Sequence, residues 1–359
     1  MTVNSVSPHP SSQYQKSLLA PCRGAVDLPQ LRSAVHDNSE RLHKQLSLDG
    51  LTPLWSAWIE QNDLSGSLPS AFRSRLRRDR QDAAGRYLLQ RQMAAKVCKC
   101  LTAHGIPHAV FKGVAVRERL YADPCLRPAD DVDLLIPSIC RDAAISALIE
   151  DGFRLVSDRR TVSHQVSLKS ALGVVDLHWA LFRPGRSRLE LAPLLLQTAH
   201  PRGMFSVLSS DADLLVMLVH PAFTKYVNGR TSRLIRVVDL DRTLRMTRPD
   251  WNWILPLIGA AGLRTAAWAV LHWQRSLMDT PVDPTVLRFL EPGRRQRRYL
   301  ASWIDHRLTA RLDMVPGLVQ WAFTLALHER PADVLRVVIQ LGKARLEAGS
   351  ILKHLQQIA

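Results

Sequence analysis

The chain has 359 residues, of which 46% are hydrophobic and 22% are charged, and this composition excludes wholesale disorder. Its 48 Lys and Arg against 32 Asp and Glu give a formal net charge of +16, which favours polyanionic partners such as nucleotides, nucleic acid or an anionic membrane face. Five cysteines without CxxC spacing argue against a zinc site and indicate reduced thiols. No apolar segment follows a basic start, so a secretory signal is not expected and a cytoplasmic protein is predicted.

The pattern along the chain changes three times. Residues 1–20 are rich in Ser, Pro and polar groups and are expected to be disordered. Residues 21–104 carry apolar side chains at three- and four-residue spacings, which predicts a helical region. A compact α/β core is expected over 105–208, and long helical segments over 209–359. This order predicts an α+β fold in which a small mixed sheet lies between helical regions.

Within the core, strands and helices are expected to alternate. The predicted elements are a strand at 108–111, a helix at 114–121, a strand in DVDLLI (131–136), a helix at 139–151, and strands in FRLVS, HQVSL and GVVDLHWAL. The most apolar stretch, 253–273, is interrupted by Arg264 and two glycines. It therefore predicts core helices, and no transmembrane segment is expected.

Paired carboxylates in the DVDLLI strand are the most informative feature. Asp131 and Asp133 alternate within an apolar strand, so they should share one face with their Cα atoms roughly 6–7 Å apart. Two buried acids repel each other unless a cation lies between them, and hard divalent ions prefer carboxylate oxygens. The alternative is a capping or surface pair in a turn. Asp130 precedes the pair and should face the other side, as a cap or an ion-pair partner.

A third acid, Asp176, lies on another apolar run, GVVDLHW. Three converging carboxylates can hold two metal ions about 3.5–4 Å apart, the arrangement used for phosphoryl or nucleotidyl transfer. We therefore expect two Mg²⁺ ions, with Mn²⁺ as the alternative ion, bound by Asp131, Asp133 and Asp176. For Asp176 the alternative is a partner for a buried arginine.

Several runs together resemble a known family. They are FKG, LYADPCLRPADDVDLLIP, VVDLHWAL, LLVMLVHPAF and RLIRVVDLDRTL, spread from about residue 101 to residue 273. In this order and spacing they resemble the uncharacterised nucleotidyltransferase family of bacteria, a divergent branch of the DNA polymerase β-like nucleotidyltransferase superfamily. The resemblance implies transfer of a nucleoside monophosphate from an NTP to a hydroxyl, with release of pyrophosphate. It does not supply the acceptor.

The resemblance also assigns residues to roles. It makes Asp131 and Asp133 the catalytic metal-binding pair, and Asp176 the third carboxylate. It puts Gly113 at the position of the superfamily's Gly-Ser phosphate turn. The usual serine after the glycine is missing, and Lys112-Gly113 stands in its place.

The Lys112-Gly113 turn is predicted to bind phosphate. Gly113 opens a helix, where free backbone N–H groups and the positive end of the helix dipole attract anions. Lys112 would add a point charge for the β or γ phosphate. The alternatives are a plain turn glycine and a solvated surface lysine.

Two further side chains complete the predicted nucleotide-binding set. His178 shares a strand face with Asp176, and it could orient that acid, touch a phosphate, or be a hydrogen-bonded core histidine. Arg127 precedes a proline just ahead of the acids, and it could clamp the triphosphate or pair with Asp130.

Other functions remain open at this stage. The basic runs 72–80 and 293–298 are candidates for nucleic-acid binding, but they lack interleaved aromatic residues and charge runs are commonly solvated faces. The basic amphipathic segment 332–358 could pack on the domain or attach to a membrane. A non-catalytic nucleotide- or partner-binding protein on the same fold is a further alternative.

Overall fold

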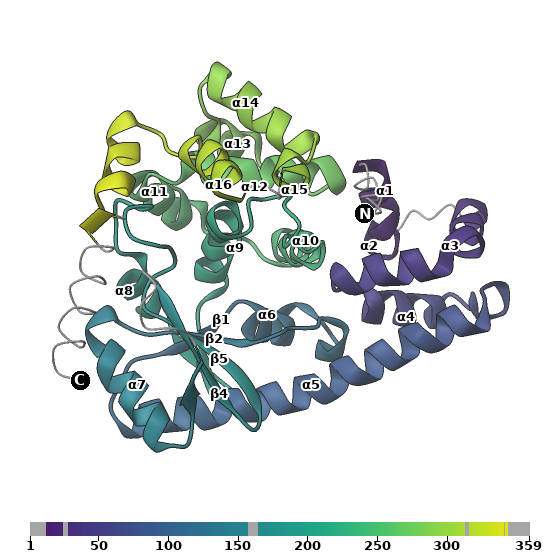
Figure 1. The fold of residues 1–359 in the computed structure, drawn as a ribbon, viewed down its shortest axis with the longest axis horizontal. Coiled ribbons are helices and arrows are strands. Elements are labelled where there is room, and N and C mark those ends of the chain that lie inside the picture. Colours follow the sequence, from purple (N-terminus) through teal and green to yellow (C-terminus); the bar gives the residue numbers. More distant parts are fainter. Residues whose placement is uncertain (1–11, 24–27, 157–163, 313–315, 341, 344–359) are drawn as a thin grey trace, which may run out of the picture.

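The fold is built on a seven-stranded mixed sheet set among helices, which confirms the predicted α+β class (Figure 1). The computed structural model describes residues 12–23, 28–156, 164–312, 316–340 and 342–343. The strands are β1 (Ala109–Phe111), β2 (Val132–Leu135), β3 (Arg154–Leu155), β4 (Gln165–Ser170), β5 (Gly173–His178), β6 (His200–Arg202) and β7 (Phe205–Val207). Their order across the sheet is β3-β4-β5-β2-β1-β7-β6.

Two parallel pairings lie at the centre of the sheet. β2 runs parallel to β5 and antiparallel to β1, while β1 runs parallel to β7. The remaining neighbours, β3 with β4, β4 with β5 and β6 with β7, are antiparallel. The β6–β7 hairpin was not predicted from the sequence, because its strands are only three residues long and carry little periodicity.

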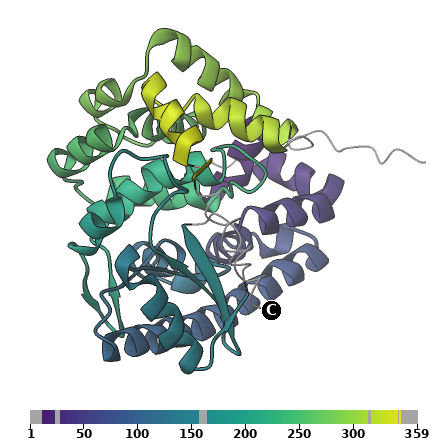
Figure 2. The same ribbon diagram turned by 60° about the vertical axis from the view of Figure 1, so that its left-hand side comes forward.

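The N-terminal helices end in one long helix that covers a face of the sheet. They are α1 (Ser12–Leu18), α2 (Ala20–Arg23), α3 (Leu28–Leu48), α4 (Thr52–Gln61) and α5 (Ser70–Ala103). At 1.5 Å per residue, α5 is about 50 Å long, and Figures 1 and 2 show it running along one side of the sheet. Its buried residues Met93, Val97 and Leu101 share a hydrophobic cluster with sheet residues such as Val132 and Leu134.

Helices that follow the sheet in the chain cover its other face. Between the strands lie α6 (Gly113–Leu120) and α7 (Arg141–Glu150), and α7 packs with α5 on the first face. The remaining helices are α8 (Leu191–Leu196), α9 (Ser210–Thr224), α10 (Ile235–Met246), α11 (Trp251–Ala261), α12 (Arg264–Leu277), α13 (Pro284–Leu290), α14 (Arg294–Asp305), α15 (Leu308–Arg311) and α16 (Pro316–Leu325). Phe111 and Leu135 of the sheet join a larger cluster that contains the apolar side chains of α9 and α10. The period-two alternation of β2 therefore puts Val132 and Leu134 toward α5 and Asp133 toward α9.

Capping residues fix several of these helices. Ser209 accepts a hydrogen bond from the N–H of Ala212 at the start of α9, and Asp250 caps α11 in the same way. Gly262 ends α11 in the left-handed conformation, with φ of 72° and ψ of 37°. These local signals fix the start of α9, which faces the carboxylate-bearing side of the sheet, and both ends of α11.

The chain ends depart in part from expectation. Residues 12–18 of the segment expected to be disordered form α1, because Leu18 and Leu19 are buried in the helical cluster. Residue 20 of that segment begins α2, and residues 1–11 lie outside the described residues. Residues 341 and 344–358 of the predicted C-terminal segment also lie outside them. Among the described residues, no helix combines the length and the apolar character that a bilayer span requires. The limits predicted for the domains remain a prediction.

Candidate active site

The turn between β1 and α6 is the first part of the site. Lys112 lies there with φ of 56° and ψ of −136°, a conformation that suits glycine and costs another residue about 1–3 kcal/mol. The buried carboxylate of Asp213 holds the turn, because it accepts a hydrogen bond from the Lys112 backbone and pairs with Arg119 at 2.8 Å. α6 then begins at Gly113, and the N–H groups of its first turn have no partner within the helix.

Two neighbouring parallel strands carry the carboxylates. Asp133 on β2 is in register with Asp176 on β5, so both side chains lie on one face of the sheet. His178 lies two residues further along β5 and shares that face. Asp131 comes just before β2 and lines the same cavity as Asp133 and Asp176. The structure therefore brings together the three carboxylates that the sequence pattern selected.

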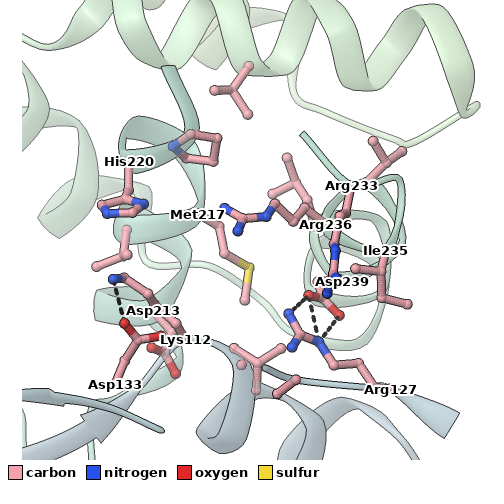
Figure 3. A pocket seen from close by; sticks show the side chains of 18 of the residues that line it. Lys112, Arg127, Asp133, Asp213, Met217, His220, Arg233, Ile235, Arg236 and Asp239 are labelled. Carbon is pink, nitrogen blue, oxygen red and sulfur yellow. Dashed lines mark hydrogen bonds and ion pairs between the residues drawn. The ribbon is translucent and has the colours of Figure 1, made fainter. Parts of the chain in front are cut away.

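Asp133 is the most heavily bonded of the three acids. Lys112 Nζ lies 2.9 Å from Asp133 Oδ1 (Figure 3). His178 Nε2 lies 2.7 Å from the same oxygen. Burial would raise the pKa of Asp133, but the Lys112 charge and the hydrogen bond from His178 outweigh it and hold the pKa below its usual range. Burial and the Lys112 charge lower the pKa of His178 in turn. The pair is thus a carboxylate and a neutral imidazole.

Asp131 has the opposite environment. Burial, reinforced by the negative charges of Asp133 and Asp176, raises its pKa from 3.8 to about 7, although the Lys112 ammonium acts against this. At Asp131 the Lys112 charge therefore does not offset burial and the two neighbouring acids. A carboxylate placed beside two other acids is well suited to a cation.

Asp176 is held by neutral hydrogen-bond donors on the adjacent strand. Gln165 Nε2 donates to one carboxylate oxygen at 2.7 Å, and Ser167 Oγ donates to the other at 2.5 Å. These residues face Asp176 because β4 and β5 pair antiparallel with Ser167 opposite it. The predicted alternative, a buried arginine partner, is not what the structure shows. Each oxygen of Asp176 keeps a lone pair for a further ligand.

The donor set fits a divalent cation. One ligand atom from each of Asp133, Asp176 and His178 lies within 4.8 Å of the other two, and Asp131 adds a fourth group on the same cavity. Carboxylate oxygens are good ligands for Mg²⁺ and Mn²⁺, and an imidazole nitrogen is a better ligand for Mn²⁺ or a later transition metal than for Mg²⁺. His178 was predicted from its strand position but not as a metal ligand.

Two cavities meet at these carboxylates. The first, here called the apolar chamber, has a volume of about 110 Å³ and is lined by Gly113 and by apolar side chains including Trp273. Met217 and Ile235 also line it (Figure 3). The second, here called the cationic chamber, has a volume of about 240 Å³ and is lined by Asp176 together with five Lys and Arg residues. The residues common to both chambers are Lys112, Asp131, Asp133, His220 and Arg236.

The sequence itself matches a family of this chemistry. Residues 36–279 match the family model described as an uncharacterised nucleotidyltransferase. The chain belongs to this family. No curated protein matches it. The family runs from α3 to the end of α12, so the match includes the turn, the carboxylate strands and both chambers.

Arg127 of this nucleotidyltransferase has a partner that the sequence did not suggest. Its guanidinium binds both oxygens of Asp239 on α10, with Nη2 2.8 Å from Oδ2, and Tyr121 donates to the same carboxylate (Figure 3). The predicted pairing with Asp130 is wrong, because Asp130 instead pairs with Arg233 at 2.7 Å. Arg127 nevertheless lines the apolar chamber next to Gly113, where it can still reach a phosphate.

Four cations of this nucleotidyltransferase line the cationic chamber and were not predicted from the sequence. They come from the segment after β5 and from the end of α9 and the start of α10, and they are Arg183, Arg186, Lys225 and Arg236. The signal was present, since the last two lie in or beside the LVHPAF and RLIRVVDLDRTL runs. Sequence spacing alone did not show that α9 and α10 face the carboxylates.

The basic runs lie on α5 and α14 and are partly neutralised. Arg80 pairs with Glu60 at 2.8 Å, and Arg297 also pairs with a glutamate, Glu291. Both runs lie away from the two chambers, which contain none of their residues. Nucleic-acid binding by these runs remains an untested alternative, and it predicts a steep loss of affinity with salt.

Proposed function

We propose that the protein transfers a nucleoside monophosphate from an NTP to a hydroxyl of an acceptor and releases pyrophosphate, with Mg²⁺ or Mn²⁺ held by Asp131, Asp133 and Asp176. One observation carries the proposal. In a chain of the nucleotidyltransferase family, three carboxylates line one cavity beside the turn that opens α6, and His178 lies against one of them. The raised pKa of Asp131, caused first by burial and then by Asp133 and Asp176, supports a bound cation there.

Bound divalent ions would neutralise charge on the phosphates and make the attacking hydroxyl more acidic. Asp176 is placed to take the hydroxyl proton, because Gln165 and Ser167 fix both of its oxygens without neutralising its charge. The backbone N–H groups at Gly113 would hold the distal phosphates at the N-terminus of α6.

Lys112 has a double role in this proposal. Its ammonium lies on Asp133, 2.9 Å from Oδ1, and 4.5 Å from the centre of the Phe111 ring, so it acts as an internal counter-ion of the acid cluster. The side chain borders both chambers. When a divalent ion takes over Asp133, Lys112 is free to bind a phosphate oxygen.

The test is label transfer from α-labelled NTPs to an acceptor panel in the presence of Mg²⁺ or Mn²⁺. The Asp133→Asn variant should lose at least ~10²-fold in rate, since a ligand shared by the ions is removed. Asp142→Asn is the matched control, because that carboxylate lies on α7 with its side chain 97% exposed. Transfer that survives Asp133→Asn while requiring no divalent ion would refute the proposal.

A non-catalytic nucleotide-binding protein is the second candidate, and the Lys112–Asp133 ion pair is the observation that favours it. A lysine that permanently occupies the cation position would let the fold bind nucleotide without turnover. The Lys112→Met variant separates the two candidates. In an enzyme it should weaken NTP binding or slow transfer, whereas in a non-catalytic protein it should create divalent-ion affinity that the wild type lacks.

A further inference from the structure

The cationic chamber carries more positive charge than its own carboxylates explain. Its lining includes the four cations already named, Arg183, Arg186, Lys225 and Arg236. Within the described part of the chain, none of the four forms an ion pair with a carboxylate. Arg186 is 7% exposed, and it donates a hydrogen bond to a neutral backbone oxygen, that of Phe223, at 2.9 Å.

The apolar chamber is different in this respect. There Arg127 is bound to Asp239 at 2.8 Å, and Arg233 is bound to Asp130 at 2.7 Å. Its cations are thus already neutralised, except for the residues that it shares with the other chamber. On the apolar side of the carboxylates, Arg127 and Arg233 form ion pairs. On the cationic side, the four cations of the described structure do not.

Burial makes these unpaired cations costly. Burial and the charges of neighbouring cations lower the pKa of Lys225 and of Arg236, and the opposing charges of nearby carboxylates such as Asp133 do not offset this. Cations in a partly buried wall are unfavourable unless an anion joins them. Two histidines, His164 and His220, add neutral donors to the same chamber. In the described structure, both ring nitrogens of His164 and the Nε2 of His220 are without a hydrogen bond.

The position of the chamber indicates which substrate supplies the anion. Asp176 lines the cationic chamber and not the apolar one, whereas Gly113 lines the apolar chamber and not the cationic one. A triphosphate at the N-terminus of α6 is therefore on the apolar side. The hydroxyl that loses its proton to Asp176 must enter from the cationic side.

We propose that the cationic chamber is the acceptor subsite, and that the acceptor carries a phosphate group close to the hydroxyl that is modified. This inference rests on the proposed function, because it assigns Asp176 to the acceptor. Guanidinium groups bind phosphate oxygens in pairs, and Arg183 with Arg186 offers two of them across a single Pro-Gly turn. A neutral acceptor would leave the buried Arg186 and the partly buried Lys225 and Arg236 without an ion-pair partner.

The first arm of the test measures binding without turnover. Inorganic phosphate is titrated by calorimetry into the protein saturated with Mg²⁺ and a non-hydrolysable NTP analogue, so that the triphosphate positions are filled. The Arg183→Gln, Lys225→Met double variant should weaken phosphate binding at least ~10-fold. The NTP analogue should bind within about threefold of its wild-type affinity. Arg288→Gln, an exposed arginine on α13, is the matched control.

The second arm measures transfer to acceptor pairs that differ only in a phosphate, such as glycerol against glycerol 3-phosphate and ribose against ribose 5-phosphate. The phosphorylated member should be preferred at least ~10-fold, and the double variant should abolish that preference. Equal use of both members would overturn the inference, as would phosphate binding that the variant leaves unchanged. A loss of analogue affinity in step with phosphate affinity would also overturn it, by assigning the anion to the triphosphate. Failure of the proposed function is seen separately, as phosphate binding without any Asp133-dependent transfer.

Discussion

Replacing Asp131 with asparagine should make the ion-free protein more stable at alkaline pH. The folded protein holds the proton of Asp131 up to about pH 7, because of burial and the charges of Asp133 and Asp176, whereas the unfolded chain releases it near 3.8. Between these values the unfolded state loses its proton first. The free energy of unfolding of the wild type therefore falls as pH rises from about 4 to about 7, and the loss is complete above that range.

The size of the effect follows from the separation of the two pKa values. The two pKa values differ by about 3, and each unit corresponds to 1.36 kcal/mol, so the difference amounts to about 4 kcal/mol. Burying the asparagine amide without a full set of partners costs about 1–2 kcal/mol. We therefore expect Asp131→Asn to raise the free energy of unfolding by about 2–3 kcal/mol near pH 8.5, and to change little or lower it near pH 5.

The assay is urea unfolding in EDTA at both pH values, with circular dichroism as the readout. Asp142→Asn serves as the exposed control and should be neutral at both. Adding Mg²⁺ should stabilise the wild type at alkaline pH and the variant much less, because ligand binding to the folded state alone raises stability. If the variant is no more stable than the wild type near pH 8.5, the carboxylates do not repel one another and the electrostatic basis of the site is wrong.

Two further substitutions test the surroundings of the site. Asp239→Asn should lower the free energy of unfolding by about 3–5 kcal/mol, since it leaves Arg127 buried without its counter-charge; a loss below about 1 kcal/mol in urea would show that this ion pair is not structural. Gly113→Ala should weaken NTP binding and cost about 1–3 kcal/mol of stability by overpacking, because the added Cβ would lie 2.8 Å from Arg127 Nη1 and 3.2 Å from Ala129 Cβ. Gly85→Ala is its control: nothing lies within 4 Å of that Cβ on α5, so a gain of up to ~1 kcal/mol is expected by thermal melting, and a loss there would contradict the packing argument.

The elements with a clear period were predictable from the sequence. The strand around Asp133 and the strand around Asp176 alternate apolar and polar residues, and both appear in the structure as β2 and β5. Gly113 marked the start of α6 correctly. The short hairpin β6–β7 could not be predicted, because pairing with β1, and not local propensity, holds it in the sheet.

The candidate site was also predictable from the sequence only in part. Residue spacing located the three carboxylates, because their positions depend on strand periodicity alone. The partner of Arg127 depends on how α10 docks on the sheet, which no local pattern encodes. Two of the four cations of the acceptor subsite, Lys225 and Arg236, likewise reach it through the docking of α9 and α10. A sequence read in one dimension shows which groups can do chemistry, and the docking of helices decides which of them meet.

The strained turn at Lys112 has a consequence for how the ligands cooperate. A divalent ion that binds Asp133 must displace the ammonium 2.9 Å away, and that displacement costs the ion part of its affinity. A nucleotide whose phosphates bind the displaced ammonium offsets this loss of affinity. Ion and nucleotide should therefore bind with positive cooperativity. Thermodynamic linkage makes the coupling reciprocal: each ligand must tighten the other by the same factor. Because of Lys112, either ligand alone should bind more weakly than it does when the other is present.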